Sequence, residues 1–148
     1  MSGTIQVANL TGKGANGALY IGRPWRGVPG SPLGNPRVVG SRSADGGTWT
    51  AGATLPHYER ELRQALARDA PRAVWGDREL TPAERDAMRR TMNDLYRRVQ
   101  GGEDVVVDCH CKAQRRPGEA APAGDPAPCH GDIVVKLVME KLRERGQA

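Results

Sequence analysis

Short apolar runs alternate with longer amphipathic segments along the chain. Apolar and polar residues alternate over 4–8, and a continuous β-branched run follows much later at 105–107. The first pattern is typical of a half-buried strand, and the second of a strand covered on both faces. Residues 18–21 predict a second short strand, and 37–39 a third. Together these strands predict a small sheet.

Three segments have the spacing of amphipathic helices. Apolar side chains recur every three or four residues over 55–67, and again from 88 to 99. The second of these helices has a clear start, because Thr-Pro-Ala-Glu at 81–84 matches a capping box with Pro at the first helical position. Gly101 and Gly102 predict its end. Residues 133–142 predict the last helix.

Strands that alternate with helices predict an α/β fold. The 148 residues suit one domain spanning 1–148, with a layered sheet, mixed or mostly parallel, flanked by about three helices. Residues 69–80 are predicted to be a connection. Residues 112–128 are rich in Ala, Pro and Gly and predict a mobile surface loop.

The chain carries a formal net charge of +5 and a pI near 9.5. This charge permits an anionic partner such as a nucleotide, a nucleic acid or an acidic surface, although an arginine-rich solvated exterior is the favoured explanation. Three cysteines cannot form a closed disulfide framework, which favours a reducing compartment. No apolar run reaches the length of a membrane span and no leader is visible, so we expect a cytoplasmic protein without a membrane partner.

Residues 22–36 form a long segment dense in Gly and Pro. Such a loop inside a small domain is usually functional or disordered, and its embedded Trp25 and Leu33 favour function. Gly22, Arg23 and Asn35 are therefore candidate ligand-binding residues. Arg23 would hold an anion and Asn35 would orient a base or sugar, although each also suits a plain surface arginine or a turn-forming asparagine.

A second cluster follows the triple valine. Cys109 and Cys111 stand at the end of that strand, while Cys129 and His130 precede the last helix, with Asp132 in its first turn. A strand end and a helix start usually meet at one edge of an α/β sheet, where ligands bind. The first interpretation is a zinc site made by Cys109, Cys111, Cys129 and His130. These ligand types suit zinc, but their spacing differs from the common zinc knuckles.

Two other interpretations of this cluster stay open. In one, Cys129, His130 and Asp132 are catalytic, since a thiol near a helix start and an imidazole is activated for nucleophilic or acid–base chemistry. In the other, the cysteines fill space, His130 caps the helix and Asp132 matches its dipole. An anion bound by the backbone amides at Gly131 is compatible with all three.

Several motifs occur together in a recognisable order. They are Tyr-Ile-Gly-Arg-Pro at 20–24, Leu-Gly-Asn-Pro at 33–36, Cys-His-Cys at 109–111 and Cys-His-Gly-Asp at 129–132. With this order the chain resembles the bacterial and phage family catalogued as domain of unknown function 4326. The resemblance covers nearly the whole chain and implies a fold and a site, but no established activity. The family usually has Trp where this chain has His110, and a shorter segment in place of 112–128.

The leading hypothesis is a small enzyme that binds a nucleotide or nucleoside-like ligand and acts as a hydrolase or group transferase at a glycosidic or phosphate bond. Its ligand would lie between the 22–36 loop and the edge that carries Cys109 and Cys129. Arg23 and the amides near Gly131 would hold the anionic group. The alternative is a zinc-stabilised, non-catalytic module that binds nucleic acid or protein; a regulatory partner protein without a ligand is a third option.

Overall fold

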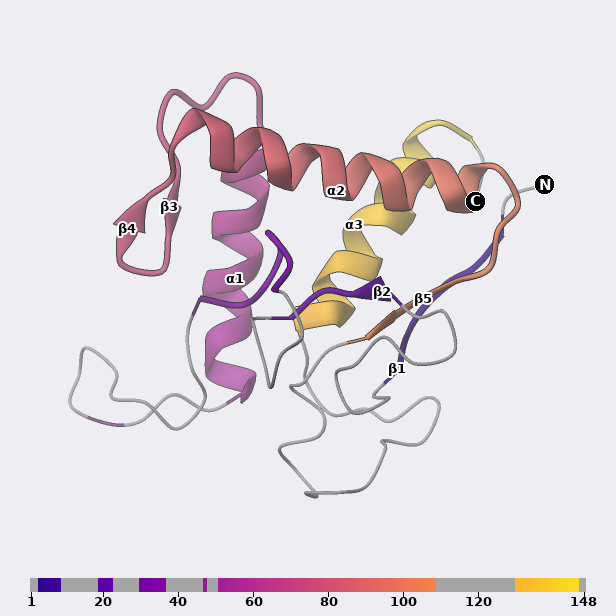
Figure 1. Cartoon of the computed structure of the whole chain (residues 1–148), viewed down its shortest axis with the longest axis horizontal. Helices are drawn as coiled ribbons and strands as arrows, with labels where there is room; N and C mark the ends of the chain where they lie inside the picture. Colours follow the sequence, from indigo (N-terminus) through magenta and orange to yellow (C-terminus); the bar gives the residue numbers. More distant parts are fainter. Residues whose placement is uncertain are drawn as a thin grey trace.

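A computed structural model describes residues 3–8, 19–22, 30–36, 47, 51–108 and 130–146. The predicted strand at 37–39 and the predicted loop at 112–128 lie outside these residues. The elements follow in the order β1 (Ile5–Ala8), β2 (Leu19–Tyr20), α1 (Ala51–Leu66), β3 (Val74–Trp75), β4 (Arg78–Glu79), α2 (Pro82–Gln100), β5 (Val105–Asp108) and α3 (His130–Glu144) (Figure 1).

The main sheet is parallel. β5 lies between β1 and β2, with Ile5 opposite Val105 and Leu19 opposite Val107. Since the three strands point the same way, their carboxyl ends meet at one edge, called the carboxyl edge below. β3 and β4 form a separate antiparallel pair. The predicted α/β fold, with a small layered sheet that is mixed or mostly parallel and about three helices, is confirmed, and the strands of the main sheet are parallel.

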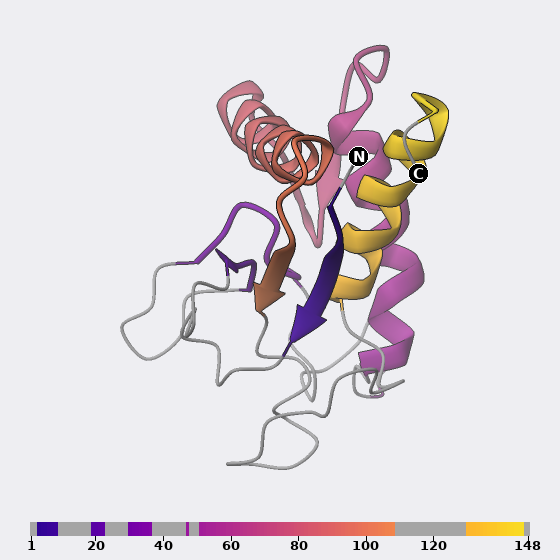
Figure 2. The same ribbon diagram turned by 90° about the vertical axis from the view of Figure 1, so that its right-hand side faces the viewer.

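The helices are layered against this sheet. α1 and α3 lie next to each other on one side of it, and α2 crosses the end opposite the carboxyl edge before the chain turns into β5 (Figures 1 and 2). The buried core joins all three helices to the sheet. Its fully enclosed members are mainly aliphatic: Ile21, Leu33, Tyr58, Leu62, Met88, Val99, Val107, Val134, Val138 and Leu142. None of the helices in the described part of the chain is long and apolar enough to cross a membrane.

The central strand is covered less evenly than predicted. Val105 and Val107 are buried, whereas Val106 is half-buried. Because successive side chains of a strand point to opposite faces, the face that carries Val105 and Val107 is the one covered more completely.

The start of α2 agrees with its prediction from sequence. The Thr81 hydroxyl accepts a hydrogen bond from the Glu84 amide at 3.2 Å, and the Glu84 carboxylate accepts one from the Thr81 amide at 3.0 Å. Both partners lie within four residues, so the signal is local and readable from sequence.

α1 and α3 both begin earlier than predicted. α1 starts at Ala51 rather than residue 55, and α3 starts at His130 rather than residue 133. The predicted bounds followed the first apolar residues, but each helix opens with small or polar residues. His130 and Gly131 therefore belong to the first turn of α3 instead of preceding it.

The predicted connection at 69–80 contains the β3–β4 hairpin. Its turn needs Gly76, which has a φ of +70°. The Gly76 amide donates a 2.8 Å hydrogen bond to the buried carboxylate of Glu61 on α1. Strands of two residues are too short to show alternation, so the pattern of apolar and polar residues did not predict the hairpin.

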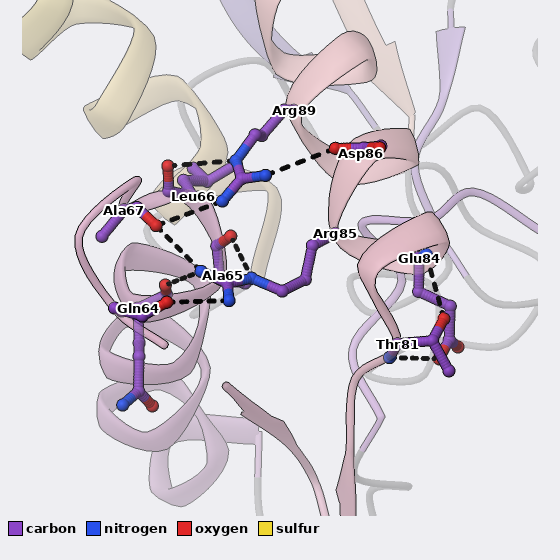
Figure 3. Close-up of polar contacts among 10 residues, drawn as sticks. Gln64, Ala65, Leu66, Ala67, Thr81, Glu84, Arg85, Asp86 and Arg89 are labelled. Carbon is purple, nitrogen blue, oxygen red and sulfur yellow. Dashed lines mark hydrogen bonds and ion pairs between the residues drawn. The ribbon is translucent and has the colours of Figure 1, made fainter. Parts of the chain in front are cut away.

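Two arginines of α2 close the carboxyl end of α1 (Figure 3). Arg85 is buried and donates to the carbonyl oxygens of Gln64, Ala65, Ala67 and Ala70 at 2.8–3.2 Å. Arg89 donates to the carbonyls of Leu66 and Ala67. The last carbonyls of a helix lack intrahelical partners and carry partial negative charge, so a guanidinium suits them well. We call Arg85 and Arg89 the arginine clamp.

Candidate functional site

The first turn of α3 lies at the carboxyl edge of the parallel sheet. Gly131 is buried there against Val7 of β1 and Ile21, the residue that follows β2. A Cβ at this position would lie 3.1 Å from both methyl groups of Val7 and 3.3 Å from Cδ1 of Ile21. Glycine therefore lets the helix approach the strand closely. This packing role differs from the predicted one, in which Gly131 admits a ligand to the backbone.

His130 ties α3 to the end of β2. Its ring is buried, and Nε2 lies 2.9 Å from the carbonyl oxygen of Ile21. A carbonyl can only accept, so Nε2 carries the proton and donates it. The ring also meets Tyr58 of α1 edge-on, with ring centroids 5.3 Å apart. His130 thus positions three segments that are distant in sequence, and this bond occupies its Nε2.

The second half of the Gly- and Pro-rich segment packs beside this junction. The Ser31 amide donates to the carbonyl of Gly22 at 2.8 Å, which holds residues 22 and 31 together. The Tyr58 hydroxyl donates to the carbonyl of Leu33 at 2.6 Å. Gly22 and the turn at 31–36 are thereby held against α1 and, through Tyr58, next to His130.

Asn35 is buried in this turn, with 4% of its surface exposed. Its Nδ2 donates to the hydroxyl of Thr54 on α1 at 3.1 Å. This bond links the turn to a side chain of another element, a contact that the sequence did not predict. Thr54 was not identified from sequence, because nothing local distinguishes it from other small polar residues at a helix start.

Asp132 is exposed in the first turn of α3, whereas His130 is buried. Positions two apart on a helix do not face each other. Helix geometry therefore disfavours a direct contact through which Asp132 would orient His130. The Asp132 carboxylate is exposed to solvent, and its charge matches the positive end of the helix dipole.

Ion pairs hold α1 and α3 together beyond the site. Lys136 donates to Glu59 at 3.0 and 3.1 Å, and Arg63 donates to Glu140 at 2.8 and 3.0 Å. The hydrogen bond from Lys136, with a further one from Arg63, lowers the pKa of the Glu59 carboxyl below its usual value. These partly exposed pairs set the register of the two helices whose first turns flank the candidate site.

The family model described as "Domain of unknown function (DUF4326)" matches residues 6–140. The chain belongs to the DUF4326 family. No curated protein and no solved structure matches it. The matched range of this DUF4326 protein runs from β1 into α3 and so includes both the Gly- and Pro-rich loop and the helix start at His130.

The structure of this DUF4326 member describes five of the predicted site residues. Gly22, Asn35, His130 and Gly131 come together around Tyr58 and the carboxyl edge, and Asp132 lies exposed beside them. Arg23, Cys109, Cys111 and Cys129 lie outside the described residues. Within those residues no three His, Cys, Asp or Glu side chains gather as metal ligands. Catalysis, ligand binding and metal binding at these positions stay predictions.

Proposed function

We propose that this DUF4326 protein binds a nucleotide or nucleoside-like ligand at the carboxyl edge and acts on it as a hydrolase or group transferase. One observation supports the proposal above all. The first turn of α3 is fastened to the end of β2 by His130, and Gly22 and the turn at 31–36 are packed beside it. Ligands of open α/β sheets bind outside the carboxyl ends of parallel strands, next to a helix start.

The proposal assigns separate roles to the residues at this edge. Backbone amides in the first turn of α3, at Gly131 and Asp132, would bind an anionic group together with Arg23. Asn35, held by Thr54, would orient the ligand. His130 is a positioning residue, because its Nε2 is engaged with Ile21. Asp132 is the acid–base group.

The proposed reaction is hydrolysis or transfer at a glycosidic or phosphate bond. In hydrolysis, the Asp132 carboxylate would take a proton from a water molecule whose oxygen attacks carbon or phosphorus. The bond to the leaving group breaks with its electron pair on that group, which is then protonated from solvent or from Asp132. Transfer replaces the water with another hydroxyl acceptor.

Thermal unfolding of the full chain with a panel of nucleosides, nucleoside monophosphates and nucleoside triphosphates tests this proposal. We expect at least one compound to raise the unfolding midpoint of the wild type. Arg23→Ala should lose the shift for phosphorylated compounds, and Asp132→Asn should keep binding but lose turnover of the bound compound.

Matched controls remove the same charges elsewhere. Asp77→Asn changes an exposed carboxylate in the hairpin turn, and Arg90→Ala an exposed arginine of α2. A wild type that no compound stabilises would contradict the proposal. So would equal loss of the shift in the control variants, because binding would then follow net charge alone.

The rival is a zinc-stabilised binding module, and the geometry of His130 favours it in one respect. A histidine that binds metal through one nitrogen usually donates the other N–H to a carbonyl or carboxylate, as Nε2 does here to Ile21. Nδ1 would then join Cys109, Cys111 and Cys129 as a ligand. This module predicts about one zinc per chain, unfolding by a chelator, and binding to nucleic acid that weakens steeply with salt.

A further inference from the structure

A hollow lies at the other end of α1 and α3, away from the candidate site. It has a volume of about 510 Å³ and is lined by the carboxyl ends of these two helices and the middle of α2. Lys141, one of its lining residues, stands eleven positions after His130 on α3, which places it about 16 Å along the helix from the carboxyl edge. This pocket is therefore distinct from the candidate site.

The lining is dominated by positive charge. It contains five basic side chains and two acidic ones: Arg63, Arg68, Arg89, Lys141 and Arg145 against Glu140 and Glu144. Two of the basic side chains already have partners within the protein. Arg63 pairs with Glu140, and Arg89 donates to helix carbonyls as part of the arginine clamp (Figure 3).

Arg68, Lys141 and Arg145 are the remaining cations. Within the part of the chain that the structure describes, none of these three forms an ion pair with a carboxylate. Lys141 donates to Oδ1 of Asn93 at 2.9 Å and lies 4.4 Å above the Tyr96 ring. Three positive charges thus line one hollow, together with Glu144 and with Glu140, which pairs with Arg63.

The electrostatics of Lys141 reflect this crowding. Burial lowers the pKa of its ammonium below the usual value, and the positive charges of Arg145, Arg97 and Arg68 lower it further, while Glu144 acts against them. A bound anion would relieve this repulsion. Met92, Tyr96 and Val138, which are buried, form an apolar part of the pocket wall, whereas Arg68, Glu144 and Arg145 are exposed at the pocket.

We propose that this pocket binds a phosphate-bearing small molecule, with Lys141, Arg68 and Arg145 as the groups that contact its phosphates. The hollow is far smaller than a groove for a nucleic-acid duplex but large enough for a polyphosphate or a nucleotide. Ammonium and guanidinium groups are the side chains best suited to phosphate oxygens. Binding here needs no residue of the carboxyl edge and does not depend on the function proposed above.

Calorimetric titration of the full chain with inorganic pyrophosphate, and separately with ATP, tests the pocket. We expect pyrophosphate to bind the wild type. The double variant Arg68→Gln/Arg145→Gln should bind it with an affinity at least about tenfold lower, because charge-assisted contacts are lost. Lys141→Met should act in the same direction. ATP that binds more tightly than pyrophosphate would identify an organic phosphate as the better ligand class.

The control is Arg90→Gln/Arg143→Gln, which removes the same charge from exposed positions of α2 and α3 outside the pocket. It should bind as the wild type does. Equal weakening in this control would overturn the proposal, as would a wild type that binds neither compound. Binding lost in Arg23→Ala but kept in the Arg68→Gln/Arg145→Gln variant would also overturn it, because the phosphate would then occupy the carboxyl edge.

Discussion

The two ends of α1 are held by different chemistry. At its start, neutral groups connect it to distant segments: Thr54 to Asn35, and Tyr58 to Leu33 and His130. At its end, Arg85 and Arg89 bind its last carbonyls directly. At the carboxyl end, the charges of the arginine clamp bind the helix itself. At the start, an exposed Asp132 lies beside buried positioning residues, which is the arrangement expected of a site.

The largest loss of stability should come from removing the arginine clamp at the carboxyl end of α1. Arg85→Met removes four hydrogen bonds, among them those to the carbonyls of Gln64 and Ala65 in the last turn of α1. We expect a loss of roughly 3 kcal/mol in the free energy of unfolding. Arg90→Met, exposed on the same helix, should cost under about 0.5 kcal/mol. Urea unfolding measures both, and similar values for the two variants would contradict the structural role of Arg85.

A smaller effect is expected at His130 of α3, which contacts Tyr58 near the start of α1. His130→Phe keeps an aromatic ring against Tyr58 but leaves the Ile21 carbonyl without its donor. We expect a loss of about 2 kcal/mol in the free energy of unfolding. His57→Phe, on a half-buried histidine of α1, serves as the control and should change stability by less than about 0.5 kcal/mol. If His130→Phe left the free energy of unfolding unchanged, His130 would not be needed to join α3 to β2.

Gly131→Ala tests how closely α3 approaches β1. The added methyl group meets both methyl groups of Val7, so we expect a loss of about 1 kcal/mol despite the better helix propensity of alanine. In a Val7→Ala background the clash is removed, and the same substitution should become neutral or stabilising. A double-mutant cycle by urea unfolding measures this coupling. Equal costs in both backgrounds would exclude the contact with Val7 as the reason for glycine.

The smallest effect concerns Glu84, which precedes Arg85 on α2. Hydrogen bonds from Arg78 and the Thr81 amide lower the pKa of its carboxyl to about 2. A depressed folded-state pKa stabilises the protein above the unfolded value of 4.5, and this contribution disappears as pH falls toward 2. Glu84→Gln keeps the cap but loses the charge, so we expect a deficit of about 0.5 kcal/mol at pH 7, because the carboxylate is partly exposed.

That deficit should shrink between pH 4.5 and pH 2, since both proteins then carry a neutral side chain at this position. Unfolding by urea across this pH range measures it. A deficit independent of pH would mean that packing, rather than charge, stabilises the start of α2.

The elements predicted well from sequence are those with local signals. The cap at Thr81 and the alternation at β1 each lie within a few residues, and both predictions are confirmed. The arginine clamp joins residues up to 23 positions apart, and the bond between His130 and Ile21 spans 109 positions. Such pairs follow from the packing of helices rather than from any local pattern, so no periodicity reveals them.

The same distinction applies to the candidate site. The motif order indicated that Gly22, Asn35 and the His130–Gly131 pair belong together, and the parallel sheet brings them to one edge. Their individual contacts were not predictable. Asn35 bonds Thr54, and Gly131 is small because Val7 lies against it. Each contact depends on the exact docking of a helix that sequence spacing does not specify.

The most direct test of the central claim is amide chemical-shift mapping of the full chain by NMR, with the nucleotide that best stabilises it. The account predicts the largest changes at Gly22, Asn35 and residues 130–132, with smaller ones toward the ends of α1 and α3. Changes confined to Arg68, Asn93 and Lys141, with the carboxyl edge unaffected, would contradict it.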